Sequence, residues 1–265
     1  MLGICTSLEK AHLAVEAGFD YVEISASEIA QQEPWTTEPY QNLPIQVVNL
    51  FFPGGVTLWD HGKFNPYHYT ENLAPRLAEL GVSIAVIGSG GQRRLAEEAM
   101  ADVVHWHPEK PQEPESVMAT LFHSLQLLCE SQLKIAPESL NRTETNVGTD
   151  CGSFARTLAE RGIGYTADLY HILREWDFDG REGGLPAPTQ AFWEEQLPFA
   201  PLHVHVAQLE GRRAPEPGDP MLEGGFARLR QLGYTGRFSL ECNGLEPGEY
   251  GPAIQNLKSY MSFAD

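Results

Sequence analysis

Strand-sized apolar runs alternate with amphipathic segments along the whole chain, and this alternation limits the possible folds more than any other feature. The runs lie at residues 2–7, 20–25, 44–52, 82–88, 133–139, 163–169, 201–207 and 236–242. Segments such as LEKAHLAVEAG and FARTLAERG separate them, and many end in Gly just before the next run, which is a common helix-stop signal. Apolar strands that alternate with helices predict a parallel sheet covered by helices.

Eight such units in 265 residues predict one closed (β/α)8 barrel, a TIM barrel, whose usual length is about 250 residues. A doubly wound open sheet is the alternative, but it would normally have fewer units and a Gly-rich first turn. No linker rich in Ser, Gly or Pro divides the chain, so we expect residues 1–265 to form a single domain. Residues 102–116 and 174–189 are rich in Pro, Gly and charge, and we expect long loops there on the C-terminal face.

The composition narrows the partners and the compartment. The formal net charge is −18, and a field of this sign repels phosphate backbones, so we expect no nucleic-acid partner. The apolar runs are much shorter than a membrane span, and the chain starts in a strand-like run without a basic leader, which together favour a cytoplasmic protein without a membrane partner. A homo-oligomer is compatible with the sequence. No CxxC pair occurs, and we expect reduced thiols at Cys5, Cys129, Cys151 and Cys242.

Four consecutive expected strands end in a residue that can bind a metal ion. These residues are Glu138, Asp168, His205 and Glu241. Side chains at the C-terminal ends of barrel strands converge, and neighbouring strands lie about 5 Å apart, so the four can surround one ion. Three carboxylates and one imidazole suit Mn²⁺ or Mg²⁺, with Co²⁺ or Zn²⁺ as substitutes. The sequence therefore predicts one divalent metal site.

The segments around these residues resemble a known family, the xylose-isomerase-like barrel superfamily of sugar isomerases and epimerases, which includes hydroxypyruvate isomerases and ketose 3-epimerases. The resemblance covers nearly the whole chain and is strongest in PESLNRTET (137–145), ADLYHI (167–172), HVHVAQLEGRRAPEPGD (203–219) and SLECNG (239–244). It implies that Glu138, Asp168, His205 and Glu241 bind the metal and that Glu138 and Glu241 also form the catalytic acid/base pair. It further implies that Glu144, His171 and Arg212 bind substrate oxygens.

These roles suit a metal-dependent isomerase or epimerase of a small ketose or hydroxy-keto acid, a carbohydrate or keto-acid substrate. Such a reaction removes a proton next to a carbonyl and returns one elsewhere. The metal polarises the carbonyl and stabilises the enediolate, while a carboxylate moves the proton. Two glutamates allow one face of the substrate to be deprotonated and the other reprotonated. Arg212 and His171 would donate to the charge that develops on oxygen, although His171 could instead cap its turn.

Three other functions fit parts of the pattern. A metal-dependent lyase, such as a dehydratase of keto-inositols or dehydroshikimate, would share the metal site and the proton abstraction. An abasic-site endonuclease uses a related barrel but needs three metals, more histidines and a basic groove, against which the negative charge argues. A barrel that only binds sugar would not need the full acid/base set. No lysine lies at the C-terminal end of an expected strand, so a Schiff-base aldolase has no candidate nucleophile.

Several further polar residues have weaker signals. His203 shares the inward face of its strand with the candidate ligand two residues later, and we expect a hydrogen-bonded core histidine. His105 and His107 lie in an expected loop without further zinc ligands at a suitable spacing, which indicates loop packing or pocket lining. Residues 88–94 contain three glycines and two arginines, and could either approach a sugar or phosphate or form an ordinary turn. Glu23 could line the pocket or form a salt bridge.

Overall fold

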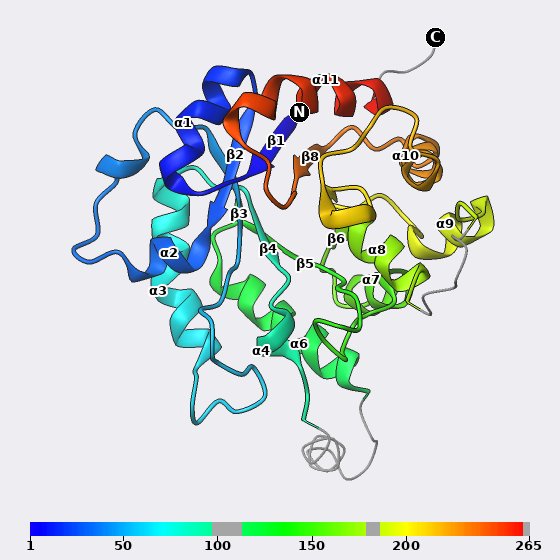
Figure 1. The fold of residues 1–265 in the computed structure, drawn as a ribbon. Helices are drawn as coiled ribbons and strands as arrows, with labels where there is room; N and C mark the ends of the chain where they lie inside the picture. The colour runs from blue at the N-terminus through cyan, green and yellow to red at the C-terminus, as the bar shows by residue number, and fades with distance from the viewer. Residues whose placement is uncertain (97–112, 179–185, 262–265) are drawn as a thin grey trace.

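The computed structural model describes residues 1–96, 113–178 and 186–261, and within them eight parallel strands form a (β/α)8 barrel (Figure 1). The strands are β1 (Leu2–Cys5), β2 (Tyr21–Ser25), β3 (Ile45–Asn49), β4 (Ile84–Ile87), β5 (Lys134–Pro137), β6 (Thr166–Asp168), β7 (His203–Val206) and β8 (Arg237–Leu240). Each lies inside one of the eight expected runs, so the predicted strand pattern and fold class are confirmed.

The barrel closes between β5 and β6. From β5 to β6 the long way round, the eight strands pair in the order β5-β4-β3-β2-β1-β8-β7-β6, and every pair in this sheet is parallel. At the remaining seam a single parallel bridge joins Glu138 to Thr166. The Thr166 hydroxyl also donates to the carbonyl of Ala136 at 3.0 Å. A side-chain hydrogen bond therefore adds to the single backbone bridge between β5 and β6.

Helices surround the strands and follow them in the expected order (Figure 1). They are α1 (Leu8–Ala17), α2 (Ala26–Gln31), α3 (Pro66–Glu79), α4 (Gly90–Arg93), α6 (Pro114–Leu128), α7 (Cys151–Ala159), α8 (Leu169–Trp176), α9 (Gln190–Gln196), α10 (Pro220–Gln231) and α11 (Tyr250–Met261), with short 3₁₀ turns at Glu38–Tyr40, Glu210–Arg212 and Pro247–Glu249. Asn65, Asp150 and Asp219 accept backbone hydrogen bonds at the starts of α3, α7 and α10, which fixes where these helices begin. None of the helices in the described ranges is long and apolar enough to cross a membrane.

The two expected long loops are partly helical. The loop expected over 174–189 is wrong at its start, because α8 continues to Trp176, whose ring packs on Phe192 at 4.7 Å between centroids. The loop expected over 102–116 is wrong at its end, because Pro114 begins α6, a position where the fixed backbone angle of proline favours a helix. Residues 97–112, which include His105 and His107, lie outside the described residues.

Inside the barrel an apolar layer lies below a polar one. Tyr21, Val47, Ile84, Val86 and Ala136 form the apolar cluster. Gly3 makes room for it, since a Cβ atom there would lie 2.3 Å from the Tyr21 ring. Next to this cluster the interior is polar, with the buried side chains Glu23, Glu138, Asp168, His203, His205 and Ser239. All four cysteines are free thiols, as expected.

Candidate metal centre

The four predicted ligands come together at the C-terminal ends of β5 to β8. Glu138 directly follows β5, Asp168 ends β6, His205 lies in β7 and Glu241 follows β8. One ligand atom from each residue lies within 4.8 Å of the others. Glu138, Asp168 and His205 are buried, and Glu241 is partly exposed. The predicted convergence is therefore present, and the open side of the cluster lies at Glu241.

The histidine lies between the two glutamates of the cluster. His205 Nδ1 is 3.0 Å from Glu138 Oε1 and 2.9 Å from Glu241 Oε2. Burial raises the pKa of Glu138 in spite of the opposing charge of His205. Burial alone would also raise the pKa of Glu241, but His205 and Arg212 outweigh it and lower that pKa below its usual value. The two glutamates thus share a neighbour but have different electrostatic surroundings.

Arg212 reaches the cluster from the 3₁₀ turn after β7. Its Nη2 lies 2.6 Å from Glu241 Oε2 and 3.3 Å from Asp168 Oδ2. Burial opposes the charge of Arg212, but the neighbouring carboxylates outweigh it and raise its pKa. Arg212 has a left-handed backbone with φ of 51°, and its guanidinium lies over the Tyr170 ring at 4.8 Å. A side chain other than glycine in this conformation is strained, and such strain is concentrated at functional sites.

His171 and Glu144 lie beside the cluster on the side of Asp168. His171 is buried, with its Nε2 3.5 Å from Asp168 Oδ2 and its Nδ1 3.7 Å from Glu144 Oε1. The interpretation of His171 as a cap is wrong, because Asp168 Oδ1 accepts from the backbone N–H groups of Tyr170 and His171 and so caps α8 itself. His171 is free to present its ring to the site.

Asn141 is a residue of this site that the sequence reasoning missed. It is buried, and its amide donates to His171 Nδ1 at 2.8 Å and to Glu144 Oε1 at 3.2 Å. Its carbonyl oxygen accepts from the backbone of Thr143 at 3.0 Å. Asn141 therefore orients two of the three residues expected to bind substrate. The signal was its place in PESLNRTET, three residues after Glu138 and three before Glu144.

The turn after β4 supports Glu138 from the other side. A Cβ atom on Gly88 would lie 2.6 Å from Glu138 Oε2, so the glycine lets the carboxylate occupy its place. Arg93 is fully buried, and its Nη1 donates to the Glu138 carbonyl at 2.9 Å. Burial lowers the pKa of Arg93 to about 10. Of the two interpretations of residues 88–94, these contacts favour a structural turn.

Glu23 and His203 form a polar layer directly beneath His205. Glu23 is fully buried and does not line an open pocket; its carboxylate contacts His203 and His205, as the salt-bridge interpretation expects. Its Oε1 is 2.9 Å from His205 Nε2 and its Oε2 is 3.0 Å from His203 Nε2. Burial alone would raise the pKa of Glu23, but the charges and hydrogen bonds of the two histidines hold it well below its usual range. The expectation that His203 is a hydrogen-bonded core histidine is confirmed.

The donor set of the cluster fits a hard divalent cation. Three carboxylates and one imidazole converge in a largely buried space, where negative charges repel each other strongly unless a cation compensates them. In the described part of the chain, Glu241 Oε2 is buried without a hydrogen bond of normal geometry and has only ion-pair contacts. Such an oxygen has a lone pair to offer to a metal.

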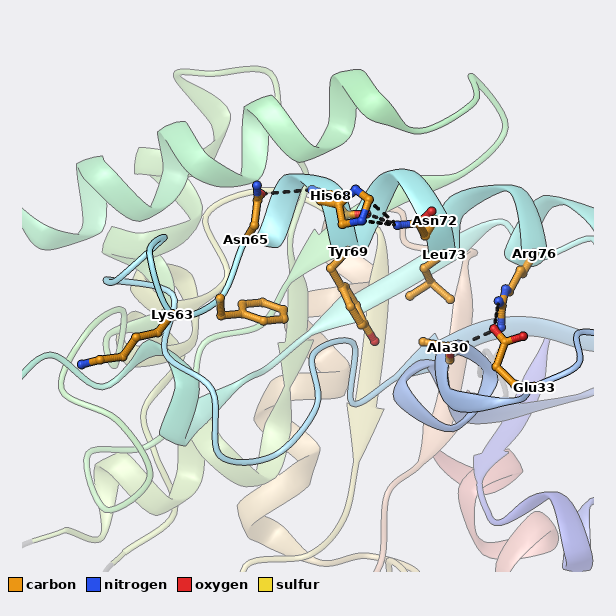
Figure 2. A pocket seen from close by; sticks show the side chains of 10 residues that line it. Ala30, Glu33, Lys63, Asn65, His68, Tyr69, Asn72, Leu73 and Arg76 are labelled. Carbon is orange, nitrogen blue, oxygen red and sulfur yellow. Dashed lines mark hydrogen bonds and ion pairs between the residues drawn. The ribbon is translucent and has the colours of Figure 1, made fainter.

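A surface cleft of about 500 Å³ lies elsewhere, along α3 and beside α2 (Figure 2). None of the predicted site residues lines it. Arg76 in this cleft donates to the carbonyls of Ile29, Ala30 and Gln32 and pairs with Glu33 at 2.6 Å. Its guanidinium therefore satisfies carbonyl groups at the C-terminal end of α2. These contacts of Arg76 serve the fold, and none of the candidate metal ligands lies in this cleft.

Comparison with known proteins places the chain in a family. A sequence model of the xylose isomerase-like TIM barrel family matches residues 11–260, so the chain belongs to this family. No curated protein gives a significant sequence match. The family assignment confirms the resemblance that the sequence motifs indicated.

Solved structures with the same fold include several sugar epimerases. A D-psicose 3-epimerase from Clostridium cellulolyticum H10, solved with D-tagatose, is 15% identical with a TM-score of 0.63, covering 100% of this chain and 92% of that one. The 3-keto-D-glucoside 4-epimerase from E. coli is 16% identical with a TM-score of 0.64, covering 97% and 98%. The protein IolI, whose structure holds a zinc atom, is 15% identical with a TM-score of 0.58, covering 98% and 96%. At these identities the similarity establishes the shared barrel.

Proposed function

We propose that the protein is a divalent-metal-dependent isomerase or epimerase that acts on a small ketose or hydroxy-keto acid. One observation carries this proposal: Glu138, Asp168, His205 and Glu241 meet within 4.8 Å at the ends of consecutive barrel strands. The site also contains a cation, Arg212, and a buried imidazole, His171, next to the carboxylates. The printed descriptions of structural neighbours, which include epimerases of D-psicose and of a 3-keto-glucoside, support the same class of chemistry.

In this proposal Glu138, Asp168, His205 and Glu241 hold one ion, with Mn²⁺ or Mg²⁺ favoured by the three carboxylates. The ion would polarise the substrate carbonyl and stabilise negative charge on its oxygen. Glu138 and Glu241 follow β5 and β8, which two other strands separate in the barrel, so their carboxylates approach the substrate from different sides. One glutamate, as a carboxylate, would take the proton from the carbon next to the carbonyl, and the other, as a carboxylic acid, would return its proton on the opposite face.

The remaining predicted residues bind and orient the substrate. The Arg212 guanidinium would donate to a carbonyl or hydroxyl oxygen where charge develops. His171 accepts from Asn141 at Nδ1, so its Nε2–H points towards Asp168 and the site. Glu144 is 41% exposed at its side chain and would accept a hydrogen bond from a substrate hydroxyl. These groups would select a polyhydroxylated carbonyl compound.

The proposal is tested by incubating the protein with a panel of ketoses, keto acids and keto-inositols in D₂O with Mn²⁺ or Mg²⁺, followed by NMR of the products. We expect an isomer or epimer with deuterium at the carbon whose proton was exchanged. Chelation should abolish the reaction. Loss of water from a substrate would support the dehydratase alternative instead, and a panel without deuterium exchange or product would contradict the proposal.

A further inference from the structure

The imidazole of His205 is held from both edges by carboxylates. On one edge, Nδ1 lies 3.0 Å from Glu138 and 2.9 Å from Glu241, the two glutamates of the candidate metal centre. On the other edge, Nε2 lies 2.9 Å from Oε1 of Glu23. The ring is buried, so no water competes with these contacts. Both ring nitrogens therefore face carboxylates, but only Nδ1 faces the candidate metal ligands.

Glu23 is itself held in place by several donors. It lies in the middle of β2 and is fully buried. The Ser239 hydroxyl donates to Oε2 at 2.7 Å, and His203 Nε2 contacts the same oxygen at 3.0 Å. Tyr21 in turn bonds through its hydroxyl to Ser239 Oγ at 2.9 Å. Side chains from β2, β7 and β8 thus fix this carboxylate at one point in the barrel interior.

Nδ1 faces the two glutamates of the candidate metal centre, so an ion bound there takes the lone pair of Nδ1, and the ring hydrogen lies on Nε2, where Glu23 accepts it. His205 therefore presents Nε2–H to Glu23 and turns Nδ1 towards the other two glutamates. We propose that Glu23 is a positioning residue, which holds the His205 ring so that Nδ1 is the metal-binding nitrogen. The inference rests on the metal site of the proposed function. A hydrogen bond from the second nitrogen of a ligand histidine to a carboxylate fixes the ring and strengthens the ligand.

The same residues could in principle form a second metal site, since Cys5, Glu23 and His205 also lie within 4.8 Å of one another. The contacts speak against it. Both oxygens of Glu23 already accept short hydrogen bonds, and the Cys5 sulfur is 3.9 Å from His205 Nε2. Burial, together with the charge of Glu23, raises the pKa of the Cys5 thiol well above its usual value. The inner edge of His205 is thus a hydrogen-bonding position.

The test compares Mn²⁺ binding by the chelator-treated wild-type protein with that of Glu23→Gln. A glutamine has the same size, but one oxygen becomes an NH₂ group that opposes a histidine N–H. We expect one ion per chain in both proteins and a Kd that is about 10- to 100-fold weaker in the variant, the usual effect of losing such a partner. The absorption spectrum of bound Co²⁺ should also change, because it reports the geometry of the ligands.

Tyr21→Phe is the matched control. It removes a buried hydrogen bond from the same polar layer but leaves the contact between Glu23 and His205 intact. We expect lower thermal stability with a Kd within about 2-fold of the wild type. Equal weakening by the two variants would mean that the layer only stabilises the fold, and would overturn the inference.

A measurement on the wild type keeps the inference testable if Glu23→Gln does not fold. NMR of ¹⁵N-labelled histidine in the Mg²⁺-loaded protein should show the hydrogen of His205 on Nε2. A hydrogen on Nδ1, an unchanged Kd in Glu23→Gln or a second bound ion would each overturn the assignment. If the wild-type protein bound no ion at all, both the proposed function and this inference would fail. If the wild type binds one ion but any of the results above is found, only the inference fails.

Discussion

Asp168 divides its two carboxylate oxygens between the fold and the site. Oδ1 accepts from the first backbone N–H groups of α8, at 2.7 Å from Tyr170 and 3.3 Å from His171. Oδ2 faces Arg212 at 3.3 Å and so points towards the other candidate ligands. Replacing Asp168 by a side chain without an acceptor oxygen would therefore disturb a helix cap as well as the site. The two glutamates have no such second role and give cleaner tests.

Glu138→Gln and Glu241→Gln should each lower turnover by at least about 10²-fold, the scale usual for losing a general base. The change keeps the side-chain volume and an oxygen that can coordinate, but it removes the proton acceptor. Steady-state kinetics at saturating Mn²⁺ separate this effect from weaker metal binding. Glu246→Gln, which removes an exposed partner of Lys10, is the control and should leave turnover unchanged. Near-normal turnover of either site variant at full metal occupancy would mean that this glutamate carries no proton.

At the scale of residues, the sequence predicted the side chains that converge but not those that support them. The candidate ligands repeat with the strands, so their positions follow from the strand pattern alone. Asn141 and Glu23 act through contacts with His171 and His205 that cross between strands. From the sequence, Glu23 could either line the pocket or form a salt bridge. The local pattern could not decide, because it does not show which side chains from distant strands contact Glu23. These contacts depend on the three-dimensional register of the barrel.

At the scale of elements, the turn after β4 positions Glu138 by leaving space for it. Gly88→Ala would add a Cβ atom 2.6 Å from Glu138 Oε2, which the carboxylate can only avoid by moving. We expect Mn²⁺ affinity to fall by about 10-fold or more, as when the support of a ligand is lost. Gly91→Ala, three residues further on, meets no atom within 4 Å and is the control. Calorimetric titration of both variants with Mn²⁺ checks this, and equal affinities would contradict the assigned role of Gly88.

The hydrogen bond between Thr166 and Ala136, at the seam between β5 and β6, should contribute to the stability of the fold. Thr166→Val keeps the shape of the side chain but removes the side-chain hydrogen bond to the buried Ala136 carbonyl. The expected loss is about 0.5–1.5 kcal/mol of the free energy of unfolding, the net contribution of one intramolecular hydrogen bond. Thr157→Val is the control, because its hydroxyl bonds to a carbonyl on an exposed face of α7. Urea denaturation measures both, and an unchanged midpoint for Thr166→Val would show that the seam does not need this bond.

The strand and helix pattern was predictable because both apolar faces of a barrel strand are buried, which makes each strand a continuous apolar run. The ends of elements were less predictable. Trp176 continues α8 because its ring packs on Phe192, a tertiary contact that composition does not reveal. Composition alone indicated a loop there, since charge and glycine dominate the residues that follow. The packing of Trp176 on Phe192 therefore sets the C-terminal end of α8.

At the scale of the whole molecule, the net charge of −18 predicts which partners the protein avoids. We expect no measurable affinity for duplex DNA at physiological salt, because the surface repels phosphates and offers few cations to replace their counterions. Fluorescence anisotropy with a labelled duplex checks this. Salt-sensitive binding in the micromolar range, or cleavage of a duplex with an abasic site, would contradict it and favour the nuclease alternative.

Four strands of one barrel bring Glu138, Asp168, His205 and Glu241 together, and we propose that they surround a single divalent ion. Titration of the chelator-treated protein with Mn²⁺, followed by the EPR signal of the free ion, tests it most directly. We expect saturation at one Mn²⁺ per chain, and loss of saturable binding when Glu138 and Glu241 are both changed to Gln. A wild-type protein without saturable binding, or a double variant that binds Mn²⁺ as well as the wild type, would contradict it.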